Sequence, residues 1–586
     1  MPEDDNEFRI LPGKVLSRGG GRPKSFVNEV LLAAKKTGGQ TSSLGRSGGF
    51  ALGRSTFGRG RNIFGRSRLH SSGRRVAIKS RIARHQGKTF RSAPMANHLS
   101  YLKRDGVTRE GDRAAMFDAQ RDRADEKAFA ERCADDRHHF RFIISPEDAA
   151  ELEDIRAFTR ELAQQMEKDL GTRLDWVAVD HWNTDNPHIH LLVRGMDETG
   201  ADLVIARDYI SQRRRSRAED LVTLELGAKP EHEIRASLER ETTHDRWTSL
   251  DREIKNLADD IGLLDLRPEQ PGPEDPFLRR QMIRRLQYLE TMGLAVTDGA
   301  GQWVLAAEAE ERLRDLGLHG DIIKTMHRAL TERGLERAYE DYVIEPPDKN
   351  PPIIGRLVAT GFHDELSGEA YAVVDGVDGR AHHIRFKSVE AFDHAPPFGG
   401  VVELRRFGDG DDPNPTLFLA NRSDLDLGRQ VTASGATWLD HRLVERTPMS
   451  LAHGGCGEEV RRALRERTDH LVAQRHARRD GGRVLFRKNL LDTLRRQELQ
   501  NVGEKIAQER GMTFNPTPPG GSVSGTYRDN IRLSSGRFAM IDDGLGFQLV
   551  PWASSLERFR DRQVSGIARG DGGIDWRRER ERGLGR

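Results

Sequence analysis

The sequence predicts an α+β protein, in which an antiparallel sheet with helices is followed by further α+β modules. Short segments at 138–145, 174–181 and 188–195 alternate apolar and polar residues, as half-buried strands do. Pro-rich breaks at 267–276 and 345–352 divide the chain, and its 586 residues are themselves enough for several domains.

The first predicted strand, HHFRFIIS at 138–145, is expected to lead directly into a helix. Ser145 suits the N-cap of that helix, and Pro146 suits its first position. Apolar residues then recur at spacings of three and four across 152–170, which indicates an amphipathic helix. Gly171 is expected to end it.

Two more strands, LDWVAVDH at 174–181 and HIHLLVRG at 188–195, are separated only by the loop WNTDNP. So short a loop indicates an antiparallel hairpin. A strand, a helix and then a hairpin predict an α+β sandwich with an antiparallel sheet. Residues 205–265, which carry many charges, are expected to be helical.

The C-terminal half contains two stretches that resemble each other. Residues 284–305 and 466–486 each read as a helix followed by a tight hairpin, and each is followed by a β-rich stretch, at 355–376 and 521–544. We interpret them as a tandem pair, each a winged-helix-like unit followed by a small β-barrel. Chance similarity between two α+β stretches is the alternative.

The predicted domains follow from these breaks and repeats. They are a basic, mostly disordered arm at 1–91, the domain with the first sheet at 92–266, winged-helix-like modules at 277–345 and 435–514, and small β-barrels at 352–425 and 520–576.

The formal charge of +2 hides an uneven distribution. Between Val30 and Arg104 there are seventeen Lys and Arg residues and no Asp or Glu. A segment of this kind suits a polyanion, most simply nucleic acid.

Membrane insertion is not expected, because no run approaches the ~20 apolar residues that cross a bilayer. Acidic residues at 3–7 do not resemble a signal peptide. Cys133 and Cys456 are the only cysteines, which excludes a disulfide framework and a thiolate metal site. A metal ion would therefore need His and carboxylate ligands, and a cytoplasmic location is expected.

Three histidines form the strongest chemical signal. Alternation places His188 and His190 on one face of a strand, and His181 ends the preceding strand. If the two strands form a hairpin, the three imidazoles can converge on one point. Three neutral imidazoles suit a divalent transition ion and leave coordination positions open, as in a catalytic site.

The pattern H-x-x-x-x-N-P-H-x-H between two apolar strands resembles the histidine motif of conjugative relaxases. These belong to the HUH endonucleases, named for two histidines that flank a hydrophobic residue, here Ile189. Two more relaxase-like motifs precede it in the expected order, HLSYLKRDG at 98–106 and FIISPED at 142–148. The resemblance covers about 92–266, and implies a relaxase-type antiparallel sheet.

The resemblance implies roles for single residues. Tyr101 would be the catalytic nucleophile, and Ser145 would contact DNA near the cleavage site. Lys103 and Arg104 lie beside the tyrosine and are expected to contact phosphate. His181, His188 and His190 would hold the metal ion.

One position departs from the family pattern. Related relaxases often have an acidic residue two positions after the first histidine, where this chain has Asn183. An amide can orient an imidazole but cannot act as a base. Asp180 or Asp185 could supply a carboxylate instead, so the general base stays open.

The activity implied is that of a site- and strand-specific DNA nickase. It would cleave single-stranded DNA at a transfer origin, form a 5′-phosphotyrosine link, and start conjugative transfer of a plasmid or integrative element. The cofactor would be a divalent metal, Mg or Mn, with zinc as an alternative. Expected partners are accessory relaxosome proteins and a type IV secretion coupling protein, and the protein would be exported with the DNA from the bacterial cytoplasm.

Other functions fit the sequence less well than this one. A rolling-circle replication initiator or a transposase of the same superfamily usually has its tyrosine after the histidine motif, whereas Tyr101 precedes His181. A non-enzymatic DNA-binding regulator would not explain three converging histidines. A zinc hydrolase unrelated to DNA would leave the basic arm unused.

Overall fold

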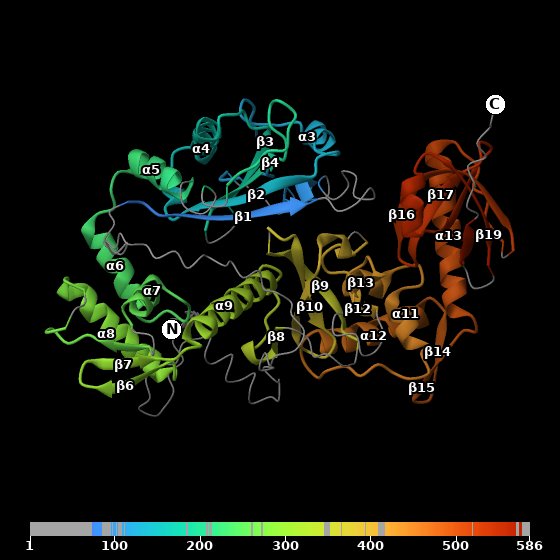
Figure 1. The fold of residues 1–586 in the computed structure, drawn as a ribbon. Helices are drawn as coiled ribbons and strands as arrows, with labels where there is room; N and C mark the ends of the chain where they lie inside the picture. The colour runs from blue at the N-terminus through green and yellow to red at the C-terminus, as the bar shows by residue number, and fades with distance from the viewer. Residues whose placement is uncertain are drawn as a thin grey trace, which may run out of the picture. The chain divides into compact units, whose positions relative to one another are not determined.

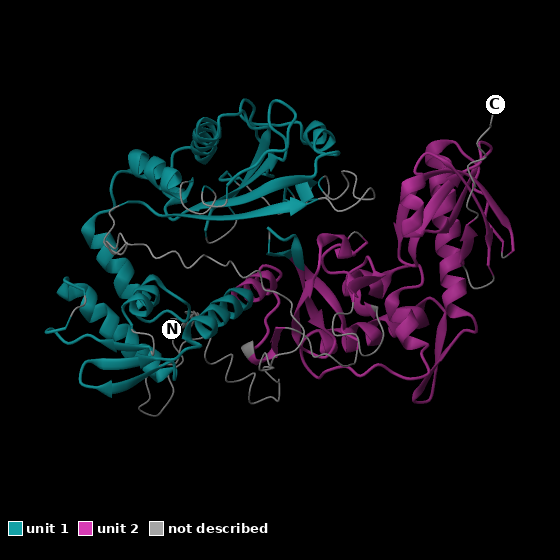
Figure 2. Cartoon of the chain, viewed as in Figure 1, with its two compact units in different colours: residues 1–32, 42–323, 361–370 teal, residues 33–41, 324–360, 371–586 magenta. Residues whose placement is uncertain are grey.

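The computed structural model describes residues 73–84, 95, 98–100, 102–103, 108–110, 112–182, 186–206, 209, 214–258, 262–270, 273–344, 352–364, 366–392, 394–407, 416–518, 520–569 and 573–576. The chain divides into two compact units, one of residues 1–32, 42–323 and 361–370, the other of residues 33–41, 324–360 and 371–586 (Figure 2). No described helix is long and apolar enough to cross a membrane.

The first unit contains a four-stranded antiparallel sheet (Figure 1). Its order is β1-β2-β4-β3, with bounds Val76–Arg84 for β1, His138–Pro146 for β2, Trp176–His181 for β3 and His188–Arg194 for β4. The three predicted strands and the predicted hairpin are thereby confirmed.

Strand β1 lies inside the segment that was predicted to be a disordered arm, and for this strand the prediction is wrong. Val76 and Ile78 are buried in the main core, and β1 pairs with β2 along its whole length. Just before it, Arg74 is 6 % exposed, and its guanidinium pairs with Asp148 at 2.8 Å. The Gly- and Arg-rich composition of the surrounding segment concealed the short strand pattern. Residues 1–72 and 85–91 of the arm lie outside the described residues.

The helix after β2 begins later than predicted. Strand β2 continues through Pro146, which lies opposite Val76 of β1, so Ser145 is not an N-cap. A short 3-10 helix follows, and α4 (Ile155–Leu170) starts behind Asp154, whose carboxylate accepts two backbone N–H bonds. The pairing of β1 with the end of β2 is a tertiary contact that the local sequence does not reveal. Gly171 ends α4 at φ 69°, as predicted.

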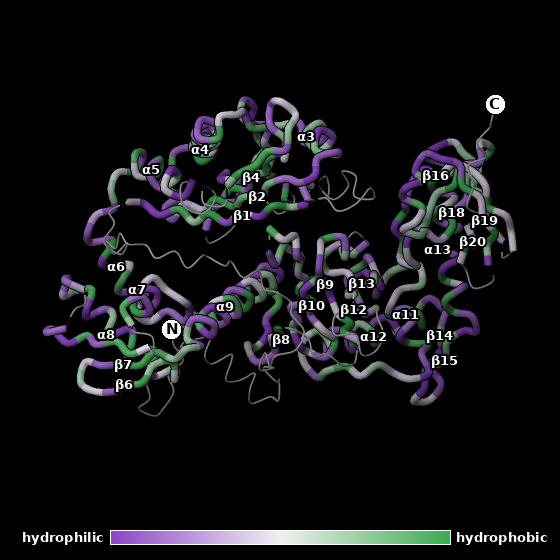
Figure 3. Tube along the Cα trace, viewed as in Figure 1, coloured by the Kyte–Doolittle hydropathy of each residue, from purple (hydrophilic) through white to green (hydrophobic). Residues whose placement is uncertain are grey.

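The two faces of the sheet are covered by different elements. Helices α4 and α5 (Arg214–Leu226) pack on one face, where Phe142, Ile189 and Leu191 are buried. Helix α3 (Glu126–Arg132) and the helical residues near position 100 pack on the other, against β3 and β4. Strands β2 and β4 contribute many of these hydrophobic residues (Figure 3).

The first winged-helix-like module starts before its predicted boundary at 277. It comprises α6 (Glu231–Glu241), α7 (Ser249–Leu257), β5 (Leu263–Asp265), α8 (Pro276–Thr291), β6 (Ala295–Gly299), β7 (Gln302–Leu305) and α9 (Ala309–Thr331). Leu264 and Leu266 share one buried cluster with residues of α7 and α8. The Pro-rich segment 267–276 thus falls between β5 and α8, two elements of one module, and the predicted division between 266 and 277 is wrong.

The second unit contains a β-sheet, a second helical module and a further sheet. The first sheet has the order β13-β12-β9-β10-β11-β8. Its strands are β8 (Tyr342–Ile344), β9 (Ile354–Asp364), β10 (Glu369–Gly376), β11 (Ala381–Phe386), β12 (Val401–Phe407) and β13 (Thr416–Ser423). The tip between β9 and β10, residues 361–370, groups with the first unit.

The second helical module comprises α10 (Leu427–Thr432), α11 (Trp438–Leu443), α12 (Gly455–Ala473), β14 (Ala477–Asp480), β15 (Arg483–Phe486) and α13 (Leu490–Arg510). Because α10 precedes residue 435, this module also starts before its predicted boundary. The last sheet has the order β18-β17-β16-β19-β20, with bounds Ser522–Leu533 for β16, Gly536–Asp542 for β17, Phe547–Pro551 for β18, Gln563–Ala568 for β19 and Ile574–Trp576 for β20.

Apart from β8, which lies at the edge of the first sheet beside β11, the two C-terminal sheets have the same topology. Counting from β9 in the first and from β16 in the second, the first strand lies in the centre, the second and third follow on one side, and the fourth and fifth follow on the other. A 3-10 helix stands between the third and fourth strands in both, at Val389–Phe392 and at Ser554–Phe559. This shared order supports the interpretation of the region as a tandem pair.

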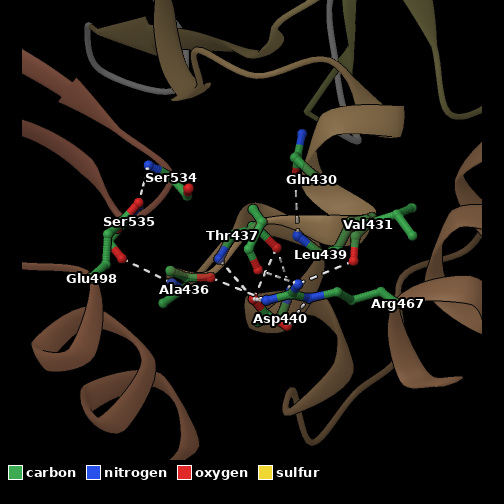
Figure 4. A network of polar contacts seen from close by, with 12 residues as sticks. Gln430, Val431, Ala436, Thr437, Leu439, Asp440, Arg467, Glu498, Ser534 and Ser535 are labelled. Carbon is green, nitrogen blue, oxygen red and sulfur yellow. Dashed lines mark hydrogen bonds and ion pairs between the residues drawn. The ribbon is translucent and has the colours of Figure 1, made fainter. Parts of the chain in front are cut away.

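A buried arginine repeats in the two helical modules. In the second, Arg467 of α12 is 0 % exposed and donates to both carboxylate oxygens of Asp440, each at 2.8 Å (Figure 4). The same Asp440 forms a capping box with Thr437 at the start of α11. Carbonyl groups of residues 431, 433 and 435 accept the remaining N–H groups of the guanidinium.

The first module has the same arrangement. Arg285 of α8 is 0 % exposed and donates to Asp251 at 2.7 and 2.9 Å. Asp251 forms a capping box with Thr248 at the start of α7, and the carbonyl groups of residues 242, 244 and 246 accept the other N–H groups. The pattern Thr-x-Leu-Asp at 248–251 and 437–440 is the sequence signal of this repeat.

Candidate active site

The structure brings the three predicted histidines together at one end of the β3–β4 hairpin. His181 lies directly opposite His188, and His190 lies opposite Val179. One ring nitrogen of each lies within 4.8 Å of the others. All three side chains are buried, with at most 8 % exposure. A buried group of three imidazoles has the donor set of a divalent metal site.

Hydrogen bonds orient His188 and His190 within this group. His188 Nδ1 lies 2.9 Å from the carbonyl oxygen of Asn186, which can only accept a hydrogen bond. The proton of His188 is therefore on Nδ1, and the lone pair of Nε2 faces His190 Nε2 at 3.2 Å. Fixing the tautomer through the outer nitrogen is how metal-binding histidines are usually held.

His181 connects the histidine group to the segment that carries Tyr101. Its Nε2 lies 2.9 Å from the carbonyl oxygen of Leu102, so Nε2 donates and Nδ1 keeps its lone pair. The residues around Leu102 that are described are helical, and Met95, Leu99 and Leu102 are buried against β3 and β4. Their spacing of four and three is that of one helix face.

Several predicted site residues lie outside the described part of the chain. These are Tyr101, Arg104, Asn183 and Asp185. Asp180 is described, and its carboxylate accepts hydrogen bonds from Arg156 at 2.9 Å and from the Trp182 indole at 2.8 Å. It lies opposite Ile189, on the sheet face away from the histidines. Asp180 is thus not placed to act as a base for the histidine site.

Ser145 and Lys103 lie near the histidine site and have partners within the protein. The Ser145 hydroxyl donates to the carbonyl oxygen of Pro187 at 3.3 Å, which ties the end of β2 to the residue before His188. The Lys103 ammonium pairs with Glu126 of α3. The proximity of Ser145 thus comes from strand pairing and not from the predicted helix start.

Two basic residues that were not predicted for the site lie on the sheet face that carries the histidines. Opposite residues of antiparallel strands share a face, and Lys79, Ile143 and His190 form one such row across β1, β2 and β4. Arg81 follows in the next row, and both Lys79 and Arg81 are exposed. The alternation in VAIKSRIAR could have revealed this strand.

Comparison with known families agrees with this site. Residues 103–223 match the family described as relaxase, MobA/VirD2-like, nuclease domain. The matched span contains Ser145 and the three histidines, and it begins two residues after Tyr101. The fold and the site thus define a relaxase nuclease domain, and the chain continues beyond it in a C-terminal extension.

The extension determines the family of the whole chain. Residues 282–411 and 415–585, together more than half of the chain, match the family named protein of unknown function DUF3363, and the chain belongs to this family. No curated protein and no solved structure matches the chain. The relaxase domain gives the protein the general role of a DNA strand endonuclease and strand transferase that acts on single-stranded DNA.

Proposed function

We propose that the protein is a site- and strand-specific nickase that starts conjugative transfer of a plasmid or integrative element. The observation that carries this proposal is the contact between His181 and Leu102, which puts the residue after Tyr101 against the histidine group. A nucleophile, a phosphate and a metal ion must meet within a few ångströms, and this contact of the neighbouring Leu102 supports such an arrangement.

The chemistry would proceed by attack of the Tyr101 phenolic oxygen on a phosphorus atom of single-stranded DNA. The bond from phosphorus to the deoxyribose 3′ oxygen breaks, and a 5′-phosphotyrosine forms. The phenol loses its proton and the 3′ oxygen gains one, so the phosphodiester energy is kept for rejoining. A tyrosine has an ordinary pKa of about 10 and therefore needs a base.

His181, His188 and His190 would hold a divalent ion, Mg or Mn, with zinc as an alternative. When bound, such an ion supplies positive charge for the non-bridging phosphate oxygens. Asp185 is our candidate for the base, and Asn183 for orienting His181. Ser145, Lys103, Arg104 and the exposed Lys79 and Arg81 would hold the DNA backbone across the sheet.

The remaining expectations concern partners and location. An origin-bound relaxase of this kind would work with accessory relaxosome proteins and a type IV secretion coupling protein. It would form its adduct in the bacterial cytoplasm and be exported with the DNA. The basic arm at 1–91, which contains fifteen of the seventeen Lys and Arg residues between Val30 and Arg104, would add affinity for DNA without sequence preference.

The proposal is tested by incubating the full chain with single-stranded DNA from the native transfer origin and Mn²⁺ or Mg²⁺. A denaturing gel should show a covalent protein–DNA adduct at one position of one strand, and no adduct with EDTA. Free cleaved DNA without an adduct would overturn the tyrosine mechanism. Equal cleavage of unrelated strands would overturn the assignment to a transfer origin.

A further inference from the structure

The hairpin of β14 and β15, here called the second wing, has an unusual concentration of positive charge. Residues 475–488 contain six basic side chains and a single acidic one, Asp480. All six are exposed: Arg475, Arg478, Arg479, Arg483, Arg487 and Lys488. The hairpin lies beside the start of α13 (Figure 1).

The fold of the second wing keeps these charges in solvent. Val484 and Phe486 pack with the buried Ala477 against a cluster around Leu471 and Leu490, and this fixes the inner face of the ribbon. The pairing of Arg478 with Leu485 and of Asp480 with Arg483 then places those side chains on the outer face. Gly481, at φ 60°, allows the tight turn between the two strands.

Most of this charge is not neutralised within the protein. Arg478 pairs only at 4.0 Å with Asp480, and Arg479 pairs with Asp469 of α12. Within the described residues, no ion pair involves Arg475, Arg483, Arg487 or Lys488. Unpaired guanidinium groups close together create a local positive potential that favours an anionic partner.

The first winged-helix-like module shows that the fold does not require this charge. Its hairpin of β6 and β7 occupies the same place after the helix with the buried arginine. Residues 294–305, which form that hairpin, contain Asp298 and no Lys or Arg. Two copies of one fold thus differ by six positive charges in the same hairpin, so the charge serves a purpose other than folding.

We propose that the second wing docks on the backbone of duplex DNA. A two-stranded β-ribbon has the width that the major groove of B-DNA admits, and a guanidinium group can donate two parallel hydrogen bonds to a phosphate. The chain carries a relaxase domain, and the DNA on either side of a nick site remains double-stranded. Duplex DNA is therefore the polyanion that we expect this surface to meet. This surface goes beyond the proposed nicking reaction, since it involves no residue of the histidine site.

The test uses the full chain and a duplex of random sequence, without metal ions. The wing variant is Arg478→Gln, Arg483→Gln and Arg487→Gln together. The matched control is Arg462→Gln, Arg496→Gln and Arg532→Gln, three exposed residues outside the wing. Both variants lose three charges and keep the basic arm. Fluorescence anisotropy gives the affinity of each at several salt concentrations, and thermal melting checks that both are folded.

The wing variant should bind duplex DNA more weakly than the control, with a shallower dependence of log K on log salt. Each lost phosphate contact lowers the slope by about 0.9, so three contacts lower it by about 2.7. Equal slopes for the two variants would overturn the proposal. A larger loss on an RNA hairpin than on duplex DNA would overturn the choice of partner. Adduct formation on single strands reports on the proposed nickase separately.

Discussion

His181 Nε2 lies 2.9 Å from the carbonyl oxygen of Leu102, so an imidazole of β3 is hydrogen-bonded to the residue that follows Tyr101. The bond joins two motifs that are eighty residues apart in the sequence. It also fixes the proton of His181 on Nε2, so Nδ1 is the ring nitrogen that keeps a lone pair for a metal ion.

The first prediction separates the nucleophile from the histidines. Tyr101→Phe should abolish the covalent adduct at every Mn²⁺ concentration, because the attacking oxygen is gone. His190→Ala removes one of three ligands, so excess Mn²⁺ should partly restore the adduct by raising occupancy. The measurement is adduct yield against Mn²⁺ concentration for both variants.

A Tyr101→Phe protein that still forms an adduct would mean that another tyrosine is the nucleophile. A His190→Ala protein whose adduct yield does not respond to Mn²⁺ would argue against a role of His190 in metal binding.

The second prediction concerns strand β1. Arg81 lies on the sheet face of the histidines, whereas Arg84, also exposed, lies on the opposite face. Arg81→Gln should lower the salt slope of single-stranded DNA binding by about 0.7, the value for one phosphate contact. Arg84→Gln should leave the slope unchanged. The same slope for both variants would show that DNA does not follow this face.

The third prediction concerns the C-terminal boundary of the nuclease domain. A chain ending at Lys229 keeps the 3.2 Å pair of Lys229 with Glu147 and all strands of the first sheet. It should be monodisperse in gel filtration and form the adduct. A chain ending at Leu266 would expose Leu250 and Ile254, whose buried partners lie on α8, and should aggregate. If the fragment ending at Leu266 were more monodisperse than the one ending at Lys229, this assignment of the core would be contradicted.

The fourth prediction concerns the repeated arginines. Arg285→Gln or Arg467→Gln leaves a fully buried carboxylate without its cation, which typically costs about 3–5 kcal/mol. Each should shift a urea unfolding transition of the full chain to lower concentration. Arg314→Gln, which breaks an exposed pair with Glu310, should shift it little. If Arg467→Gln shifted the urea transition no more than Arg314→Gln does, a structural role of Arg467 would be contradicted.

The fifth prediction concerns pH. Burial, aided by Arg495 and Arg442, lowers the pKa of His441, and burial, aided by Arg487, lowers that of His476. The unfolded chain therefore binds these protons more readily than the folded one. Stability should be full above the ordinary histidine pKa of about 6.5 and should fall as the pH drops below it.

Thermal melting between pH 7.5 and 5.5 measures this loss. His441→Gln combined with His476→Gln should flatten the pH dependence, and the exposed His453→Gln should not. A pH dependence that is unchanged in the double variant would assign the loss to other groups.

Local patterns explain which predictions held. The strands at 138–145, 174–181 and 188–195 follow from alternation, and the histidine group follows from the short loop between the last two. The helix start at Ser145 failed because Pro146 is paired with Val76, far away in the sequence. The boundary after residue 266 failed because a Pro-rich composition marks loops inside modules as well as linkers between them.

By itself, the sequence determined the hairpin that carries His181, His188 and His190, because strand alternation and a short loop are local properties. It also indicated the class of nuclease, because the histidine pattern and the two motifs before it resemble those of relaxases. Only the tertiary structure placed Leu102 against His181 and added β1 with Lys79 and Arg81 to the histidine face. These relations depend on which distant segments bury each other, and no local pattern in a single sequence encodes that pairing.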